Sequence, residues 1–307
     1  MSITITGGFT STGGGFTLVA APSESTASWI AGGSNAGSTV QRITYSTDTS
    51  TPSIRGPLSI ARPRLTATGN LNYGWNAGGY FNGDISTVDR ITYATDTNTS
   101  SVRGPLSIGN SNFAGTGNDT NGWFAGGTAG PVTSRVDRIT YATDTATASV
   151  RGPLSSIICA EAAAGTSTDG WFAGGESGGA KSTVNRITYA TDTATASVRG
   201  PLSLERFYLA AAGNDTYGWF ADGYVSTVDR ITYATDTATA SVRGPLSSAR
   251  YGLGGSGNMT DGWFAGGGGG VVSTVDRITY ATDTSTASVR GPLAQGAGFV
   301  ASASGLQ

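Results

Sequence analysis

The sequence contains no histidine and a single cysteine, Cys159, among its 307 residues. Histidine is the commonest general base and the commonest metal ligand near neutral pH. Its absence excludes Ser-His-Asp catalysis and histidine-bound zinc or copper. A lone cysteine can form neither an intramolecular disulfide nor a thiolate metal cluster. We therefore expect no catalytic residues, no cofactor and no metal site.

Charge and long apolar runs are also scarce. Charged residues make up 12% of the chain, the net charge is -2, and Lys181 is the only lysine beside 17 arginines. Without a basic tract, nucleic acid is not an expected partner. The Met1–Ile5 start has neither a basic region nor a long apolar run, so we expect no signal peptide and no membrane insertion.

Glycine, in contrast, is abundant, with 48 residues. This is more than twice the usual share of about 7%. A disordered chain of this kind would also need a large net charge, which is missing. The composition therefore favours a compact fold built from small residues.

Three short patterns recur along the chain in register with one another. Arg-Ile-Thr-Tyr and Arg-Gly-Pro-Leu each occur six times, at the same steps of 48, 48, 48, 44 and 47 residues, and each copy also has one of the six tryptophans. The sequence therefore consists of six copies of one unit. The copies begin at Arg42, Arg90, Arg138, Arg186, Arg230 and Arg277 for the first pattern and at Arg55, Arg103, Arg151, Arg199, Arg243 and Arg290 for the second, and the tryptophans are Trp29, Trp75, Trp123, Trp171, Trp219 and Trp263.

Each unit contains four short segments rich in β-branched and aromatic residues, separated by Gly, Asn, Asp and Pro. In the last unit these predict strands over Arg250–Gly254, Gly262–Gly267, Val275–Ala281 and Ala287–Arg290. A Gly-Pro pair ends the fourth strand, because proline has no N–H for the ladder. No stretch has helical periodicity, so almost no helix is expected.

Six units of four antiparallel strands predict an all-β fold, a six-bladed β-propeller. The unit resembles a kelch repeat in its length and in the Gly-Gly pair that closes an aromatic second strand. It departs from kelch because each tryptophan precedes the Gly-Gly pair. We therefore expect a kelch-like propeller.

The ends of the chain leave the closure of the ring open. We expect an amino-terminal segment over 1–15, the propeller over 16–293, and a closing strand or tail over 294–307. Both Phe16–Ala20 and Phe299–Ser302 match the inner strand of the first unit. One of the two is therefore spare, and a spare edge strand can pair with another chain, which keeps self-association possible.

Residues that recur in all six units are more consistent with structure than with one asymmetric active site. We expect the repeated arginines to satisfy carbonyls and carboxylates and the repeated aspartates to bond the local backbone of their turns. Cys159 is expected in the inner strand of the fourth unit as a small buried residue. The repeated aspartates are Asp48, Asp96, Asp144, Asp192, Asp236 and Asp283.

Differences between the units concentrate in two connections, from the second to the third strand and from the fourth strand to the next unit. In an up-and-down blade both emerge on one side, so that side is predicted as the recognition face; neutral drift of surface loops is an equally good explanation. Its candidate residues are Arg62, Arg64, Tyr80, Phe81, Asn82, Asp84, Phe207, Tyr208, Tyr224, Arg250 and Tyr251.

The amino-acid sequences of the repeats indicate a family more specifically than the fold does. Gly-Trp-Phe-Ala-Gly-Gly, Ser-Thr-Val-Asp-Arg-Ile-Thr-Tyr-Ala-Thr-Asp-Thr and Ser-Val-Arg-Gly-Pro-Leu-Ser resemble the kelch-like repeat proteins of marine tailed phages. The resemblance implies a non-enzymatic virion structural protein (tail, fibre or capsid decoration) assembled in the host cytoplasm. Its implied partners are other virion proteins or copies of itself, and a glycan or protein of the host surface.

Two other functions remain open. One is a bacterial lectin-like or protein-binding propeller without a viral role. The other is a propeller hydrolase or lyase acting on glycans, which needs an asymmetric acid/base pair near the central channel. Glu161 and Glu205 are its only unique candidates in the predicted inner strands.

Overall fold

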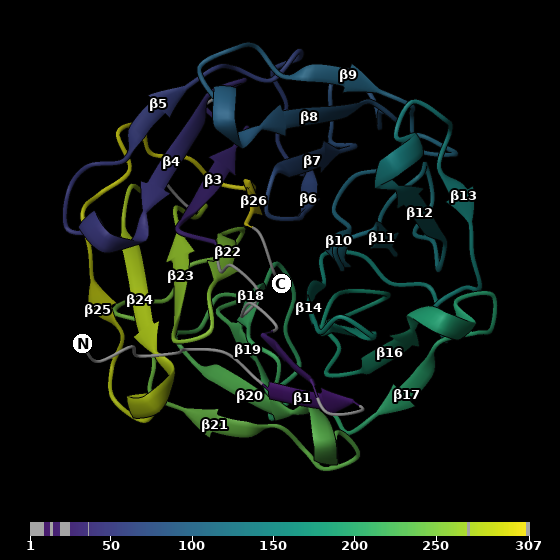
Figure 1. The fold of residues 1–307 in the computed structure, drawn as a ribbon, viewed down its shortest axis with the longest axis vertical. Coiled ribbons are helices and arrows are strands. Elements are labelled where there is room, and N and C mark those ends of the chain that lie inside the picture. Colours follow the sequence, from purple (N-terminus) through teal and green to yellow (C-terminus); the bar gives the residue numbers. More distant parts are fainter. Residues whose placement is uncertain (1–8, 13–14, 19–24, 36, 269–270, 305–307) are drawn as a thin grey trace.

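A computed structural model describes residues 9–12, 15–18, 25–35, 37–268 and 271–304. Six four-stranded antiparallel sheets stand radially around a central axis (Figure 1). The predicted all-β, six-bladed propeller is therefore confirmed. We number the blades in chain order. Within each blade the strands are given in order from the axis to the rim. The blades are β26-β3-β4-β5, β6-β7-β8-β9, β10-β11-β12-β13, β14-β15-β16-β17, β18-β19-β20-β21 and β22-β23-β24-β25.

The second and third strands of each blade are its longest, with five residues each. The second strands are β3 (Ala27–Ala31), β7 (Tyr73–Ala77), β11 (Asn121–Ala125), β15 (Asp169–Ala173), β19 (Tyr217–Ala221) and β23 (Asp261–Ala265). The third strands are β4 (Val40–Thr44), β8 (Val88–Thr92), β12 (Val136–Thr140), β16 (Val184–Thr188), β20 (Val228–Thr232) and β24 (Val275–Thr279).

The third and fourth strands are joined by one turn of 3-10 helix, and these turns are the helices of the described chain. They are η1 (Tyr45–Thr47), η2 (Tyr93–Thr95), η3 (Tyr141–Thr143), η4 (Tyr189–Thr191), η5 (Tyr233–Thr235) and η6 (Tyr280–Thr282). The outer strands are β5 (Ser53–Arg55), β9 (Ser101–Arg103), β13 (Ser149–Val150), β17 (Ser197–Arg199), β21 (Ser241–Arg243) and β25 (Ser288–Val289). Within the described ranges, no helix is long and apolar enough to cross a membrane.

The inner strands consist mainly of alanine and glycine. They are β26 (Ala301–Ala303), β6 (Thr66–Gly69), β10 (Ala114–Gly117), β14 (Ala162–Gly165), β18 (Ala210–Gly213) and β22 (Gly254–Gly257). In the sixth blade the strand predicted over Arg250–Gly254 thus begins only at Gly254. Small residues are typical of turns, but here they form a strand because neighbouring inner strands approach so closely that a Cβ on Gly255 would overlap the carbonyl oxygen of Ala211.

The carboxyl-terminal segment closes the ring. Strand β26 pairs with β3 in blade 1, with Ala301 opposite Ala31 and Ala303 opposite Trp29. The other candidate for this strand begins in β2 (Gly15–Leu18), which pairs with β1 (Phe9–Thr12), and its last two residues lie outside the described ranges. The chain thus completes its first blade with its last strand.

The hydrophobic core is divided into six clusters, one at each junction between neighbouring blades. The preceding blade contributes a tryptophan, small residues and the leucine of Arg-Gly-Pro-Leu, and the following blade contributes larger apolar side chains. Each blade therefore covers the flank of its neighbour, as the repeat pattern predicts. At the junction of blades 4 and 5 the main members are Trp171, Ala173, Val184 and Leu202 against Phe220, Ile231 and Tyr233.

The glycine of Arg-Gly-Pro-Leu is required by the same packing. The Gly200 N–H donates to the carbonyl of Asp236 in the next blade at 2.8 Å. A Cβ at Gly200 would overlap the carbonyl oxygen of Ala238. The repeated glycine thus lets the outer edge of one blade contact the backbone of the next.

Candidate functional site

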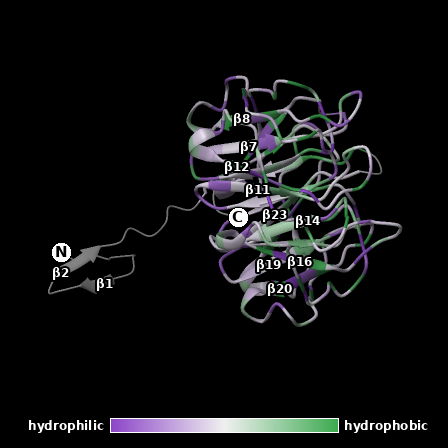
Figure 2. Ribbon diagram, turned by 90° about the vertical axis from the view of Figure 1, so that its right-hand side faces the viewer, coloured by the Kyte–Doolittle hydropathy of each residue, from purple (hydrophilic) through white to green (hydrophobic). Residues whose placement is uncertain are grey.

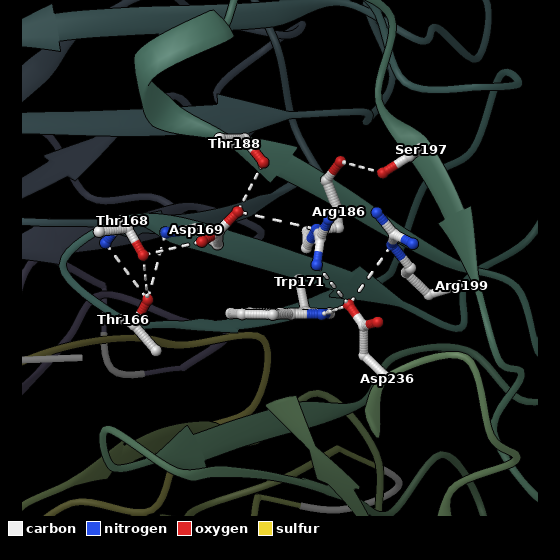
Figure 3. A network of polar contacts seen from close by, with 9 residues as sticks. All are labelled: Thr166, Thr168, Asp169, Trp171, Arg186, Thr188, Ser197, Arg199 and Asp236. Atoms are coloured by element: carbon white, nitrogen blue, oxygen red, sulfur yellow. Dashed lines mark hydrogen bonds and ion pairs between the residues drawn. The ribbon is translucent and has the colours of Figure 1, made fainter. Parts of the chain in front are cut away.

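The repeated aspartates, arginines and tryptophans meet at the blade junctions (Figure 3). Between blades 4 and 5, the Trp171 indole N–H donates to Asp236 at 2.9 Å. The same carboxylate oxygen accepts from Arg186 at 3.1 Å and pairs with Arg199 at 3.4 Å. The Trp171 ring stacks on Tyr233, with centroids 4.0 Å apart. All six junctions contain this arrangement.

These contacts correct one detail of the sequence interpretation. The aspartates were expected to bond the backbone of their own turns, whereas their side chains reach across to the preceding blade. The sequence could not show this, because it does not say which blade faces a given turn. The structural role predicted for the ladder residues fits these contacts, since each set is occupied in joining two blades.

Replacing Asp236 with alanine is expected to destabilise the protein by about 2 to 3 kcal/mol, because a buried indole N–H and two arginines lose one shared acceptor. Chemical denaturation measures this loss. Asp215→Ala provides the matched control: Asp215 is exposed in the same blade, and surface substitutions usually change stability by less than about 0.5 kcal/mol. Equal losses in both variants would contradict the junction model.

A second set of ion pairs lies beneath the predicted recognition face. Arg62 pairs with Asp89 at 2.9 Å and is 0% exposed. Arg250 pairs with Asp276 at 2.6 Å and is 5% exposed. The expectation that these two arginines face a partner is therefore wrong. The sequence suggests surface residues because the connections that contain them vary between units. In the structure both arginines bind carboxylates inside the molecule.

Six residues, one from each blade, form a closed ring of backbone hydrogen bonds around the axis. The N–H of each donates to the carbonyl of the ring residue in the preceding blade, at 2.6–3.0 Å. Every member has a positive φ between 52° and 67°, although only one is glycine. We call this set the axial ring; it consists of Arg64, Asn112, Ala160, Tyr208, Gly252 and Phe299.

Aromatic side chains gather on one sector of the axial ring. Two ring members contribute, together with residues from the connections of blades 5 and 6. Tyr224 stacks on Tyr251 with centroids 4.2 Å apart and an interplanar angle of 22°. Tyr208 contacts Phe299 edge-on at 5.0 Å, and Phe207 lies 5.3 Å from Tyr224. We call these five residues the aromatic mouth.

Charged groups lie near the aromatic mouth. The Arg64 guanidinium lies 5.8 Å from the Phe299 ring centroid and 5.6 Å from that of Tyr80. Burial raises the pKa of Tyr208 and Tyr224; the positive charge of Arg64 opposes this shift at Tyr208, and the negative charge of Glu176 adds a smaller increase to both. The mouth therefore combines ring faces and phenol groups with one cation and one carboxylate.

The predicted recognition residues are thus only partly brought together. Arg64, Tyr80, Phe207, Tyr208, Tyr224 and Tyr251 lie at or beside the mouth. Phe81 and Asn82 are exposed on the loop of blade 2. Asp84 holds that loop to blade 3, accepting from the Ser111 hydroxyl at 2.7 Å and from the Gly130 N–H at 3.1 Å.

Sequence reasoning missed two members of this site, Phe299 and Glu176. Phe299 had been read as part of a strand, whereas it is the axial-ring residue of blade 1. Aligning the tail with the other five connections would have placed it beside Tyr208 and Gly252. Glu176 lies in the connection between β15 and β16, and no sequence pattern connects it with tyrosines of the next blade.

The floor of the mouth contains an extra carboxylate, Asp222. It has a φ of 73° at the position where the other blades have the first glycine of Gly-Gly. Its Oδ1 accepts from the Arg250 N–H at 2.6 Å. Burial raises its pKa to about 7, against the lowering effect of Arg250 and Arg206. Asp222 thus lies two residues before Tyr224 and holds the base of the mouth to the next blade.

A narrow channel along the axis has a cavity of about 100 Å³. Its lining includes Ala163, Ala211 and Gly255 from the inner strands, and Glu161, one of the two carboxylates considered for catalysis. Glu161 is 5% exposed, whereas Glu205 is exposed on a connection. The small inner-strand residues explain why the channel is narrow.

The position and burial of Cys159 differ from those predicted from the sequence. It lies in the connection before β14, not in the strand, and it is only partly buried. Its sulfur lies 3.5 Å from the carbonyl of Glu176. Burial and the neighbouring Glu161 raise its pKa to about 11, so the thiol is protonated at neutral pH. In the residues described above, no group of three or more His, Cys, Asp or Glu side chains is placed to hold a metal ion.

A comparison of the chain with protein-family models and a comparison with curated protein sequences each found no match.

Proposed function

We propose that this propeller is a non-enzymatic structural protein of a tailed-phage particle that contacts the host surface through the face bearing the aromatic mouth. One observation carries the recognition part of the proposal. In a molecule whose blades are nearly identical, the residues that differ place five aromatic rings from blades 5, 6 and 1 in mutual contact.

The position of this cluster supports recognition rather than stability. The disc, seen from the side in Figure 2, is already held by six repeated junctions. Tyr224 remains 50% exposed, although a tyrosine that served only the core would be covered. Exposed, rigid aromatic side chains with polar tips are typical of binding surfaces.

A non-enzymatic role agrees with how the carboxylates near the mouth are used. Asp229 and Asp276 pair with buried arginines, and Asp222 binds a backbone N–H. Hydrolysis of a glycan needs two carboxyl groups free to act on one substrate. The assignment to a phage particle rests on the resemblance of the repeat sequences to those of marine phage proteins.

Two measurements test the proposal. Antibodies raised against the purified chain should label tailed particles recovered from the source culture, and the labelled purified protein should adhere to host cells. Labelling of bacterial cells instead of particles would favour the bacterial lectin-like or protein-binding alternative. Absence of adhesion, with labelled particles, would leave an architectural part without a recognition role.

A further inference from the structure

We infer that the aromatic mouth binds a glycan, with the apolar face of a pyranose ring stacked on tyrosine and its hydroxyl groups bound by flanking polar residues. This inference rests on the proposed recognition function and specifies its ligand class. It is carried by the ring geometry of the mouth, by the charged groups beside it and by the locked backbone that holds it.

The stacking surface is Tyr224. One face of its ring covers Tyr251 at 4.2 Å, and the residue is still 50% exposed, which leaves ring surface open to solvent. An aromatic face has negative electrostatic potential. The C–H groups on one side of a pyranose are weakly positive and apolar, so the two surfaces are complementary.

The flanking residues match the hydroxyl groups of a sugar. Arg64 offers several N–H donors, and the Glu176 carboxylate accepts hydrogen bonds. The tyrosines add phenol groups that donate and accept. A sugar ring presents donors and acceptors around its edge and C–H groups on its face, and the mouth and its neighbours offer partners for both.

The backbone holds these side chains in place before a ligand arrives. Tyr208 and Phe299 have left-handed φ values of 58° and 55°, which ordinary residues adopt only at a cost. The axial ring fixes both: the Tyr208 carbonyl accepts from Gly252 at 2.9 Å, and the Phe299 N–H donates to the Gly252 carbonyl at 2.6 Å. A preorganised site loses less entropy on binding.

The shortened repeat of 44 residues explains why the mouth occurs only once. Its loop between β19 and β20 retains Tyr224 and Val225, where other blades have longer loops. The Tyr224 N–H then donates directly to the Arg250 carbonyl at 2.8 Å, next to Tyr251. Because this loop is shorter, the Tyr224 side chain lies against the aromatic ring of Tyr251, in the connection to blade 6.

The size of the mouth favours a sugar over a folded protein. Its five rings pack on one another with centroids 4.2–6.2 Å apart, so they form one small patch, whose extent suits one or a few pyranose rings. A stable protein interface needs about 800 Å² on each partner and would extend well beyond these five residues. A protein ligand is therefore an outcome for the test to exclude.

The test uses the full-length chain on a printed array of neutral and acidic oligosaccharides, followed by calorimetric titration with the best binder. We expect Tyr224→Ala and Tyr251→Ala to weaken that binding at least tenfold and Tyr224→Phe to weaken it less, because the ring face is kept. Val242→Ala is the control: it removes an apolar side chain that is 60% exposed on the outer edge of the same blade. Thermal melting shows that each variant is folded.

Binding that survives Tyr224→Ala unchanged would overturn the inference. So would an array without any bound glycan while the same protein adheres to host cells, because that pattern identifies a protein receptor and keeps the proposed function. A chain that neither binds glycans nor adheres to cells would refute both the inference and the recognition part of the proposed function. Comparing neutral with acidic sugars in Arg64→Gln then shows whether the bound glycan is anionic, since only an anionic ligand loses an ion pair with the guanidinium.

Discussion

A chain that ends at Gly298 is expected to lose the cooperative unfolding transition of the full-length protein. The removed segment contains β26, which is the inner strand of blade 1. Without it, β3 has an unpaired edge and the axial ring loses Phe299, which donates to Gly252 and accepts from Arg64. Two junction cores are also opened, because Val300 packs toward blade 6 and Ala301 toward blade 2.

The expected loss is at least about 5 kcal/mol, which approaches the whole stability of many domains. Differential scanning calorimetry and fluorescence of the junction tryptophans should show a broad transition at much lower temperature. The matched control removes residues 1–18 instead. That truncation takes away β1 and β2, which pair with one another and with no other strand in the described chain, so the sharp transition should remain. If both truncations melt alike, closure by the carboxyl-terminal strand is not what holds the ring.

The sequence predicts this architecture well where it repeats. The tryptophan, Arg-Ile-Thr-Tyr and Arg-Gly-Pro-Leu ladders give the number of blades and strands, because each pattern must satisfy the same junction six times. The inner strands are misplaced for a physical reason. Segments such as Ala210–Gly213 have the composition of a turn, and their small size is required only by neighbours that sequence order does not show.

The candidate site is predictable only in outline. Varied connections indicate one face, but variation alone does not separate Tyr224, which is exposed, from Arg62, which is fully buried. The distinction depends on Asp89, which lies 27 residues away and pairs with Arg62 at 2.9 Å. The axial ring is equally hidden from the sequence, because its bonds join backbone atoms of residues as different as Ala160 and Tyr208.

Glu161 occupies a position that suits an apolar residue. The equivalent residues in the other blades are Leu65, Phe113, Leu209, Leu253 and Val300, which are all buried. The Glu161 carboxyl group packs against Gly126 of the preceding blade, and neither of its oxygens has hydrogen-bond geometry to a described partner. Burial raises the pKa of Glu161 well above its usual value of 4.5, although its own N–H and that of Ala114 oppose the shift.

Replacing Glu161 with leucine is therefore expected to stabilise the protein, and by more as the pH rises. A carboxyl group with a raised pKa in the folded state binds a proton more tightly there than in the unfolded chain. Glu161 therefore destabilises the folded state least below pH 4.5. The free energy of unfolding then falls by about 1.4 kcal/mol for each pH unit between the pKa of the unfolded chain and that of the folded state. Leucine has no such loss, and Leu209 shows that it fits the equivalent place against Gly174.

Denaturant titrations at pH 4.5 and pH 8 measure this difference directly. We expect the gain from Glu161→Leu to be larger at pH 8 than at pH 4.5, and Glu205→Leu, which changes an exposed glutamate on a neighbouring connection, is the matched control. Asp222, whose pKa is also raised, to about 7, is present in all three proteins and cancels from the comparison. A gain that is independent of pH would mean that Glu161 is ionised in the fold and has a partner, which would place a charge in the wall of the channel.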